Sequence, residues 1–246
     1  MMGFQTWQNK GAGAPVLIFI PGFLSETNQA TGLNAWRKGL LQFARRRHLT
    51  CSDLVWESES LFTAIAPLLN IHSNPEEMLK VWDSAKTKSE EVAQRLASVV
   101  EQMQEPVHIV GHSLGAVIGA RTAQLLQNKT LQSLTLLAPA IKASDFNEQQ
   151  VVRRVETPPH IFHSRRDMTL MCLFGLSQFP DTIASKNPLS YFNQILATRI
   201  HDPALGVVGL DSPLSISIDV TPLLHFQYAN VIHDILRQAP HLKAGS

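Results

Sequence analysis

The chain has 246 residues and a formal net charge of +1 at pH 7, and 17% of its residues are charged. This near-neutral balance supplies no general electrostatic attraction to nucleic acid or to an anionic membrane, so we expect neither as a partner. The length and the plentiful aliphatic residues predict a single globular α/β domain over residues 1–246 with a substantial core.

Short apolar runs alternate along the chain with helical patterns. This order is typical of a mostly parallel sheet with helices packed on both faces. We expect helices at about 33–47, 75–104, 114–127 and 226–238, the third of them beginning directly after the turn at residue 113. The expected strands cover 16–20, 53–56, 107–110, 133–137, 159–164 and 215–220.

The cysteines and the apolar segments indicate a cytoplasmic protein. Cys51 and Cys172 have no metal or redox spacing and are most simply free thiols in a reducing compartment. No apolar segment is long enough to cross a bilayer, and the run 16–24 is interrupted by Pro21 and Gly22, which makes it a poor signal-peptide core. The sequence also lacks clustered metal ligands, so we expect no metal and no cofactor. The number of subunits stays open.

The most informative stretch is Gly111-His112-Ser113-Leu114-Gly115, a match to the pattern G-x-S-x-G. It follows a buried strand and precedes a helix that begins with small residues. A nucleophile elbow has this arrangement, because the serine occupies a strained turn and small neighbours let strand and helix approach closely. We therefore predict Ser113 as a nucleophile.

A serine hydroxyl needs a base to take its proton and an acid to orient that base. In hydrolases of this architecture the chain order is Ser, then Asp or Glu, then His. Asp167 directly follows the strand 159–164 and is the preferred acid, although an aspartate there could also serve as a helix cap. The other aspartates between Ser113 and the C-terminal histidines are Asp181, Asp202, Asp211 and Asp219, of which Asp219 is the strongest competitor.

His225 is the preferred base, since it lies in the loop between the last strand and the last helix. His233, inside that helix, and His241, in the tail, are the alternatives. His112 is unsuitable because neighbouring side chains on a tight turn diverge, and we expect it to pack beneath the elbow.

The developing oxyanion needs backbone donors. The N–H of Leu114, next to the nucleophile, is one expected donor. The other should come from the turn after the first strand, where Phe23 is preferred and Leu24 is next. Gly22 would let this turn bend sharply.

These residues together resemble the α/β-hydrolase superfamily over about 16–236, most of the chain. The resemblance implies the α/β-hydrolase fold, a Ser113–His225–Asp167 triad and an oxyanion hole. A fainter likeness points to hydrolases related to transmembrane and coiled-coil domain-containing proteins, but the chain lacks the membrane segments of their larger members, so their location does not carry over. It also has Pro21 where the superfamily usually has histidine. The motifs behind the two likenesses are Ile20-Pro-Gly-Phe23, Val110-Gly-His-Ser-Leu-Gly115, Gly22-Phe-Leu24, Asp219-Val-Thr221, His225 and Tyr228.

The expected function is cleavage of a carboxylic ester, with a lipid-like acyl substrate, through an acyl-enzyme. Residues 168–214 begin with a strongly apolar stretch, which is consistent either with a small lid over an acyl pocket or with a sheet-packing helix. A thioesterase or acyltransferase with the same triad is the alternative enzyme. A non-catalytic binding protein that keeps the fold is the third hypothesis.

Overall fold

The computed structural model describes residues 2–22, 33–56, 75–167, 169–171, 202–225 and 227–238. Within these ranges the chain forms one seven-stranded sheet in the order β1-β3-β2-β4-β5-β6-β7. Only β1 runs antiparallel to its neighbour, and the remaining pairs are parallel. The strands are β1 Gly3–Gln8, β2 Val16–Ile20, β3 Thr50–Val55, β4 Val107–His112, β5 Ser133–Leu137, β6 His160–His163 and β7 Ile216–Asp219.

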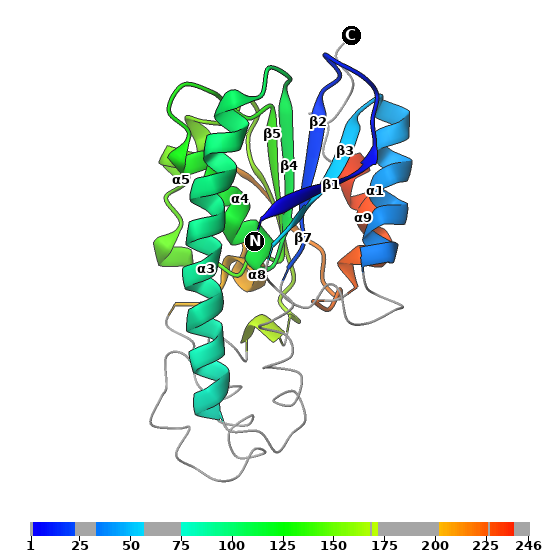
Figure 1. Cartoon of the computed structure of the whole chain (residues 1–246). Helices are drawn as coiled ribbons and strands as arrows, with labels where there is room; N and C mark the ends of the chain where they lie inside the picture. Colours follow the sequence, from blue (N-terminus) through cyan, green and yellow to red (C-terminus); the bar gives the residue numbers. More distant parts are fainter. Residues whose placement is uncertain are drawn as a thin grey trace.

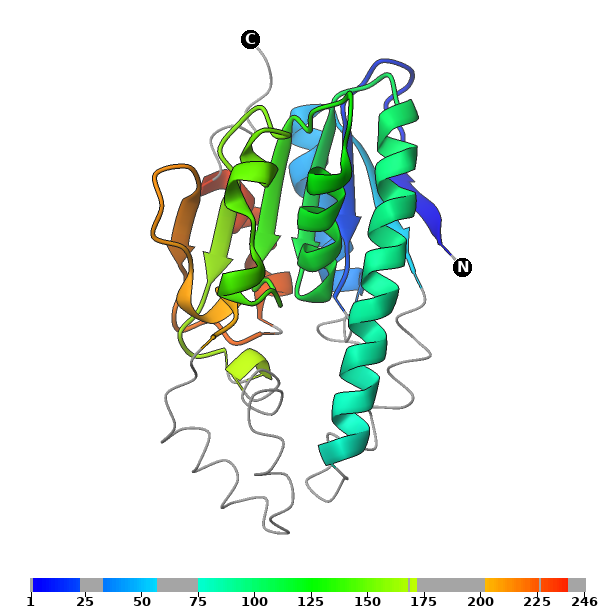
Figure 2. The ribbon, with the colours of Figure 1, turned by 90° about the vertical axis from the view of Figure 1, so that its left-hand side faces the viewer.

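Helices cover both faces of the sheet (Figure 1). One face carries α1 and α9, which pack on each other, and the other carries α3, α4 and α5. A 3-10 turn at Ala143–Asp145 and the short α8 lie near the edge at which the parallel strands end (Figure 2). The helices are α1 Leu33–Arg47, α3 Pro75–Gln102, α4 Leu114–Leu125, α5 Glu148–Val152, α8 Leu205–Val208 and α9 Tyr228–Gln238.

The fold confirms the expected α/β class. The strands predicted at 16–20 and 133–137 and the helix predicted at 33–47 have the observed bounds, and the other predicted elements differ by a few residues at their ends. The central strands β4 and β5 are buried at every residue, which explains why both have mostly apolar sequences without a polar face. The sequence did not predict β1, because this edge strand is mostly exposed and its polar residues resemble a loop.

The elbow lies so close to β2 that residue 115 has no room for a side chain. A Cβ added at Gly115 would lie 2.0 Å from the carbonyl oxygen of Ile20, a backbone atom that cannot move aside. The small-residue face of α4 continues at Gly119, where a Cβ would lie 3.1 Å from the Ile109 side chain. The small residues predicted to let strand and helix approach therefore do so, most tightly beside Ser113.

Gly115→Ala should destabilise the fold strongly, because the added methyl group must displace the backbone of β2. We expect a loss of about 3 kcal/mol or more in the free energy of unfolding, measured by urea titration. Gly119→Ala is the matched control on the same helix. Its milder contact is opposed by a gain of about 1 kcal/mol in helix propensity, so its stability should stay near that of the wild type. Equal losses in the two variants would contradict the close approach at Gly115.

Candidate active site

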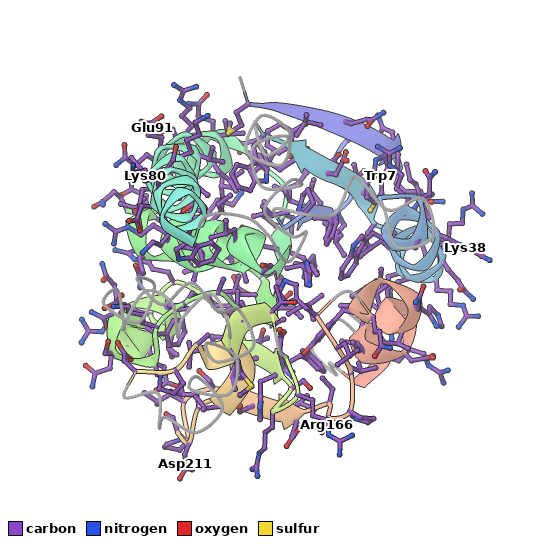
Figure 3. All side chains as sticks on the ribbon, turned by 90° about the horizontal axis from the view of Figure 1, so that it is seen from below. Trp7, Lys38, Lys80, Glu91, Arg166 and Asp211 are labelled. Atoms are coloured by element: carbon purple, nitrogen blue, oxygen red, sulfur yellow. The ribbon has the colours of Figure 1, made fainter. Side chains whose placement is uncertain are left out.

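The candidate site lies at the edge where the parallel strands end, and Figure 3 views the molecule from that side. In open parallel sheets this edge is where ligands bind, since the loops that leave the strands converge there. Charged side chains lie around the periphery of this view, among them Lys38 on α1, Lys80 and Glu91 on α3, and Asp211. The three residues described next are instead buried near the ends of β4, β6 and β7.

Ser113 occupies the turn between β4 and α4 in a strained conformation, with φ 55° and ψ −119°. Its N–H donates to the carbonyl of Leu137 at 2.9 Å, which ties the turn to the end of β5. Serine at a helix N-cap usually accepts a hydrogen bond from the first turn, but here the side chain makes no cap bond. Its hydroxyl is therefore available to another partner.

That partner is His225, on the loop between β7 and α9. The distance from His225 Nε2 to Ser113 Oγ is 3.0 Å, and that from His225 Nδ1 to Asp167 Oδ2 is 2.8 Å. A carboxylate can only accept, so Nδ1 must carry the proton in this arrangement. The bare Nε2 can then accept the hydroxyl proton of Ser113. The three side chains are 5%, 4% and 0% exposed for Ser113, His225 and Asp167, so water competes little for these bonds.

Asp167 uses its two carboxylate oxygens for different partners. Oδ2 faces His225, and Oδ1 accepts the N–H of Leu170 at 3.0 Å, while the carbonyl of Asp167 accepts the N–H of Met171. Asp167 is thus both a helix cap and the partner of the imidazole. The sequence offered a helix cap and an acid as alternatives for Asp167, and its hydrogen bonds are compatible with both at once.

The other candidate acids and bases lie elsewhere. Asp219, at the end of β7, accepts the N–H of Thr221 and lies 3.3 Å from Arg165; hydrogen bonding by Thr221, helped by the nearby positive charge of Arg165, lowers the pKa of the Asp219 carboxyl. His233, on α9, has its Nδ1 3.3 Å from Asp234. Asp202 bonds Ser144 and Asp211 is exposed. Asp181 and His241 lie outside the described residues.

The expected oxyanion donors are described in part. Leu114 is the first residue of α4, so its N–H has no carbonyl partner within the helix. Gly22 lies against the elbow, because a Cβ added there would be 2.8 Å from the Cβ of Ser113. The turn after β2 therefore reaches Ser113. Phe23 and Leu24, the candidates for the second donor, lie outside the described residues.

His112 packs beneath the elbow, as expected from the sequence. Its ring is 3% exposed and lies between those of Trp36 and His225, at centroid distances of 4.9 and 4.8 Å. Burial, with His225 nearby, holds the pKa of His112 well below its usual 6.5, so the ring stays neutral. Its Nε2 lies 3.0 Å from the carbonyl oxygen of His225, and no sequence pattern predicts this contact.

The described residues contain no group of three or more His, Cys, Asp or Glu side chains arranged to hold a metal ion. Among the described helices, none is long and apolar enough to cross a membrane. Cys51 is buried within β3, and burial beside Asp53 raises the pKa of its thiol to about 12. Most of the segment expected to form a lid, and Cys172 within it, lies outside the described residues.

A model of the family described as "Thioesterase domain" matches residues 50–186, more than half of the chain. The match includes Ser113 and Asp167 and ends before His225. No curated protein sequence matches the chain.

Several solved structures are similar to the chain over most of its length. The esterase domain of a Rhodothermus marinus protein is 13% identical, with all of both chains covered and a TM-score of 0.47. A lipase-esterase related protein from Clostridium acetobutylicum is 12% identical, with 97% of this chain and 99% of that one covered and a TM-score of 0.44. A poly(3-hydroxybutyrate) depolymerase from Bordetella parapertussis is 13% identical, with 97% and 85% covered and a TM-score of 0.46.

The strain at Ser113 gives a prediction about stability. Ser113→Ala and Ser113→Gly both remove the hydroxyl, but only glycine adopts φ 55° with ψ −119° without a steric penalty. The glycine variant should therefore be more stable than the alanine variant by about 1 kcal/mol, measured by urea titration. Greater freedom of the unfolded chain costs the glycine variant about 0.4–1 kcal/mol, so an alanine variant that is the more stable of the two would show that the strain at residue 113 is smaller than this cost.

Proposed function

Because the chain belongs to the thioesterase family of α/β-hydrolases, we propose that it is a serine hydrolase that cleaves a carboxylic ester through an acyl-enzyme. Ser113 is the nucleophile, His225 the base and Asp167 the acid. The observation that carries this proposal is the continuous hydrogen-bonded chain from Ser113 Oγ through the imidazole to the carboxylate of Asp167.

In the first half of the reaction, Ser113 Oγ forms a bond to the acyl carbon while its proton passes to His225 Nε2. The imidazolium that results is stabilised by Asp167, whose carboxylate lies 2.8 Å from Nδ1. The tetrahedral intermediate collapses as the bond to the leaving oxygen breaks, and Nε2–H returns its proton to that oxygen. The products of this half are an alcohol and the acyl-enzyme.

In the second half, a water molecule attacks the acyl carbon and gives its proton to Nε2. Collapse of the second tetrahedral intermediate breaks the bond to Ser113 Oγ, which regains its proton, and a carboxylic acid leaves. In both halves the negative oxygen needs donors. We assign the N–H of Leu114 as one donor and the N–H of Phe23, which lies outside the described residues, as the other.

A thioester is the second candidate substrate, and the family match is the observation that favours it. The chemistry of the three residues is the same in both cases, since only the leaving atom changes from oxygen to sulfur. Acyl transfer to an alcohol in place of water would also use the same acyl-enzyme. For each of these reactions we propose an acyl substrate, lipid-like in character, and a cytoplasmic setting.

Labelling with a fluorophosphonate probe tests the proposed nucleophile. The intact protein should carry the label on Ser113, and Ser113→Ala should abolish both labelling and turnover of p-nitrophenyl butyrate. Loss of the base should be nearly as severe, with His225→Ala lowering kcat by up to about 10⁶-fold. Absence of any label on the wild-type protein, with a known serine hydrolase labelled in parallel, would favour the non-catalytic binding protein.

His233→Ala is the matched control for the base. His233 was the alternative base in the sequence, and it lies within the described residues. Its turnover should stay within about two-fold of the wild type, because a residue that makes no contact with the reacting atoms changes transition-state binding little. Retained activity in His225→Ala together with loss in His233→Ala would reverse the assignment.

The leaving group is tested by offering butyrate esters of an alcohol and of its thiol analogue at equal concentration. If the protein is adapted to esters, kcat/KM should be higher for the oxygen ester even though the thioester is intrinsically the better acyl donor to a serine. A thioester preference of about 100-fold or more, equivalent to about 3 kcal/mol of transition-state stabilisation, would assign the protein to thioester hydrolysis.

A further inference from the structure

We infer that His112 is a positioning residue for the base, acting by donating its Nε2–H to the backbone carbonyl of His225. This inference rests on the proposed function, because it concerns how the Ser113–His225–Asp167 arrangement is held. It assigns a role to the first of the two variable residues of the elbow motif, which takes no part in the reaction steps described above.

The hydrogen bond has a single possible direction. A carbonyl oxygen can only accept, so His112 Nε2, 3.0 Å away, must carry the proton. Burial keeps the ring neutral, so Nδ1 then has a bare lone pair, and in the described structure this buried nitrogen has no hydrogen-bond partner. Leaving a buried acceptor such as Nδ1 without a partner costs free energy. The same ring makes the hydrogen bond to the loop that carries His225, and we infer that this bond is the reason a histidine is kept here.

The surroundings of His112 hold its ring in one orientation. Phe19 of β2 packs on Trp36 of α1 at a centroid distance of 4.9 Å, and Trp36 packs on His112 at the same distance. On the α9 side, the Tyr228 ring lies 5.8 Å from that of His112. The donor therefore sits on a support built from a strand and two helices, and the base loop rests on that support.

Two successive residues of the elbow thereby hold the same base at two points. Ser113 meets the imidazole at Nε2, while His112 meets the backbone of the same residue on the α1 and α9 side. Without the backbone bond, the ring of His225 would be oriented by its partners, but its Cα would depend on a loop. Loops are the most mobile connections, and a displacement of about 1 Å at a reacting group can lower the rate by about 100-fold.

The test compares three substitutions at residue 112. His112→Phe keeps an aromatic ring and removes the donor. His112→Gln places an amide N–H near the position of Nε2, and His112→Asn carries the same group on a shorter side chain that cannot reach the carbonyl.

His108→Phe is the matched control. His108 is also a buried histidine of β4, hydrogen-bonded to Ser133, and burial lowers its pKa to about 4, but it lies at the other end of the strand.

We expect His112→Phe to lower both the fluorophosphonate labelling rate and kcat by about 100-fold, with KM changed less than about two-fold. His112→Gln should recover at least about ten-fold of that loss, equivalent to one restored hydrogen bond, and His112→Asn should recover little. His108→Phe should lower the melting temperature but label as fast as the wild type. If His112→Phe does not fold, the comparison of Gln with Asn carries the test.

Two results would overturn the inference: His112→Phe labelling as fast as His108→Phe, or Gln and Asn giving the same rate. A second readout needs no turnover. The downfield proton resonance of the His225–Asp167 hydrogen bond should be sharp in the wild type and in His112→Gln, and broadened or lost in His112→Phe and His112→Asn. If the wild type never labels, the proposed function fails, and this resonance still decides whether His112 positions the imidazole.

Discussion

The arrangement of the site depends on how closely helix α4 approaches strand β2. A Cβ at residue 115 would lie only 2.0 Å from the carbonyl oxygen of Ile20. The first turn of α4 can therefore lie at this position only because residue 115 is glycine. That approach forces the chain to reverse within one residue, and Ser113 takes the positive φ that the reversal requires. The hydroxyl is consequently presented at the end of the sheet and is not used to cap the helix. A contact between two backbones thus determines where a side chain is available.

Once Ser113 is placed, the sheet brings its two partners from distant parts of the chain. Asp167 follows β6, His225 follows β7, and both strands end on the same edge as β4. The carboxyl ends of parallel strands lie at the same edge of the sheet. Residues that follow different strands, and that are more than fifty positions apart in the sequence, therefore lie close together. The exact orientation of the three side chains then depends on neighbouring contacts, such as the N–H of Leu170 on Asp167 and the ring of His112 on the backbone of His225.

The sequence predicted the parts of this protein that depend on apolar pattern and chain order. Runs such as 133–137 identify buried strands because both of their faces must be covered. The order Ser113, Asp167, His225 follows from the order of the strands, and the structure brings these three side chains together. β1 could not be predicted in this way, because it is held to β3 by backbone hydrogen bonds and its mostly exposed side chains form no apolar pattern. The bond from His112 to a carbonyl more than a hundred residues away was equally inaccessible, because any residue could supply that oxygen.

The divided hydrogen bonding of Asp167 has a consequence for the direction of the proposed proton transfer. The backbone donor at Leu170 demands an acceptor at Oδ1, so an amide at this position would turn its oxygen towards the helix and its nitrogen towards the imidazole. The imidazole would then have to present a bare Nδ1 to that nitrogen and a proton to Ser113, which reverses its tautomer. In the wild type the carboxylate alone fixes the direction of these bonds, since both of its oxygens accept. In an amide variant the turn at Leu170 would decide the direction instead, so a neutral isostere of Asp167 would leave the geometry intact while the proposed proton transfer points the wrong way.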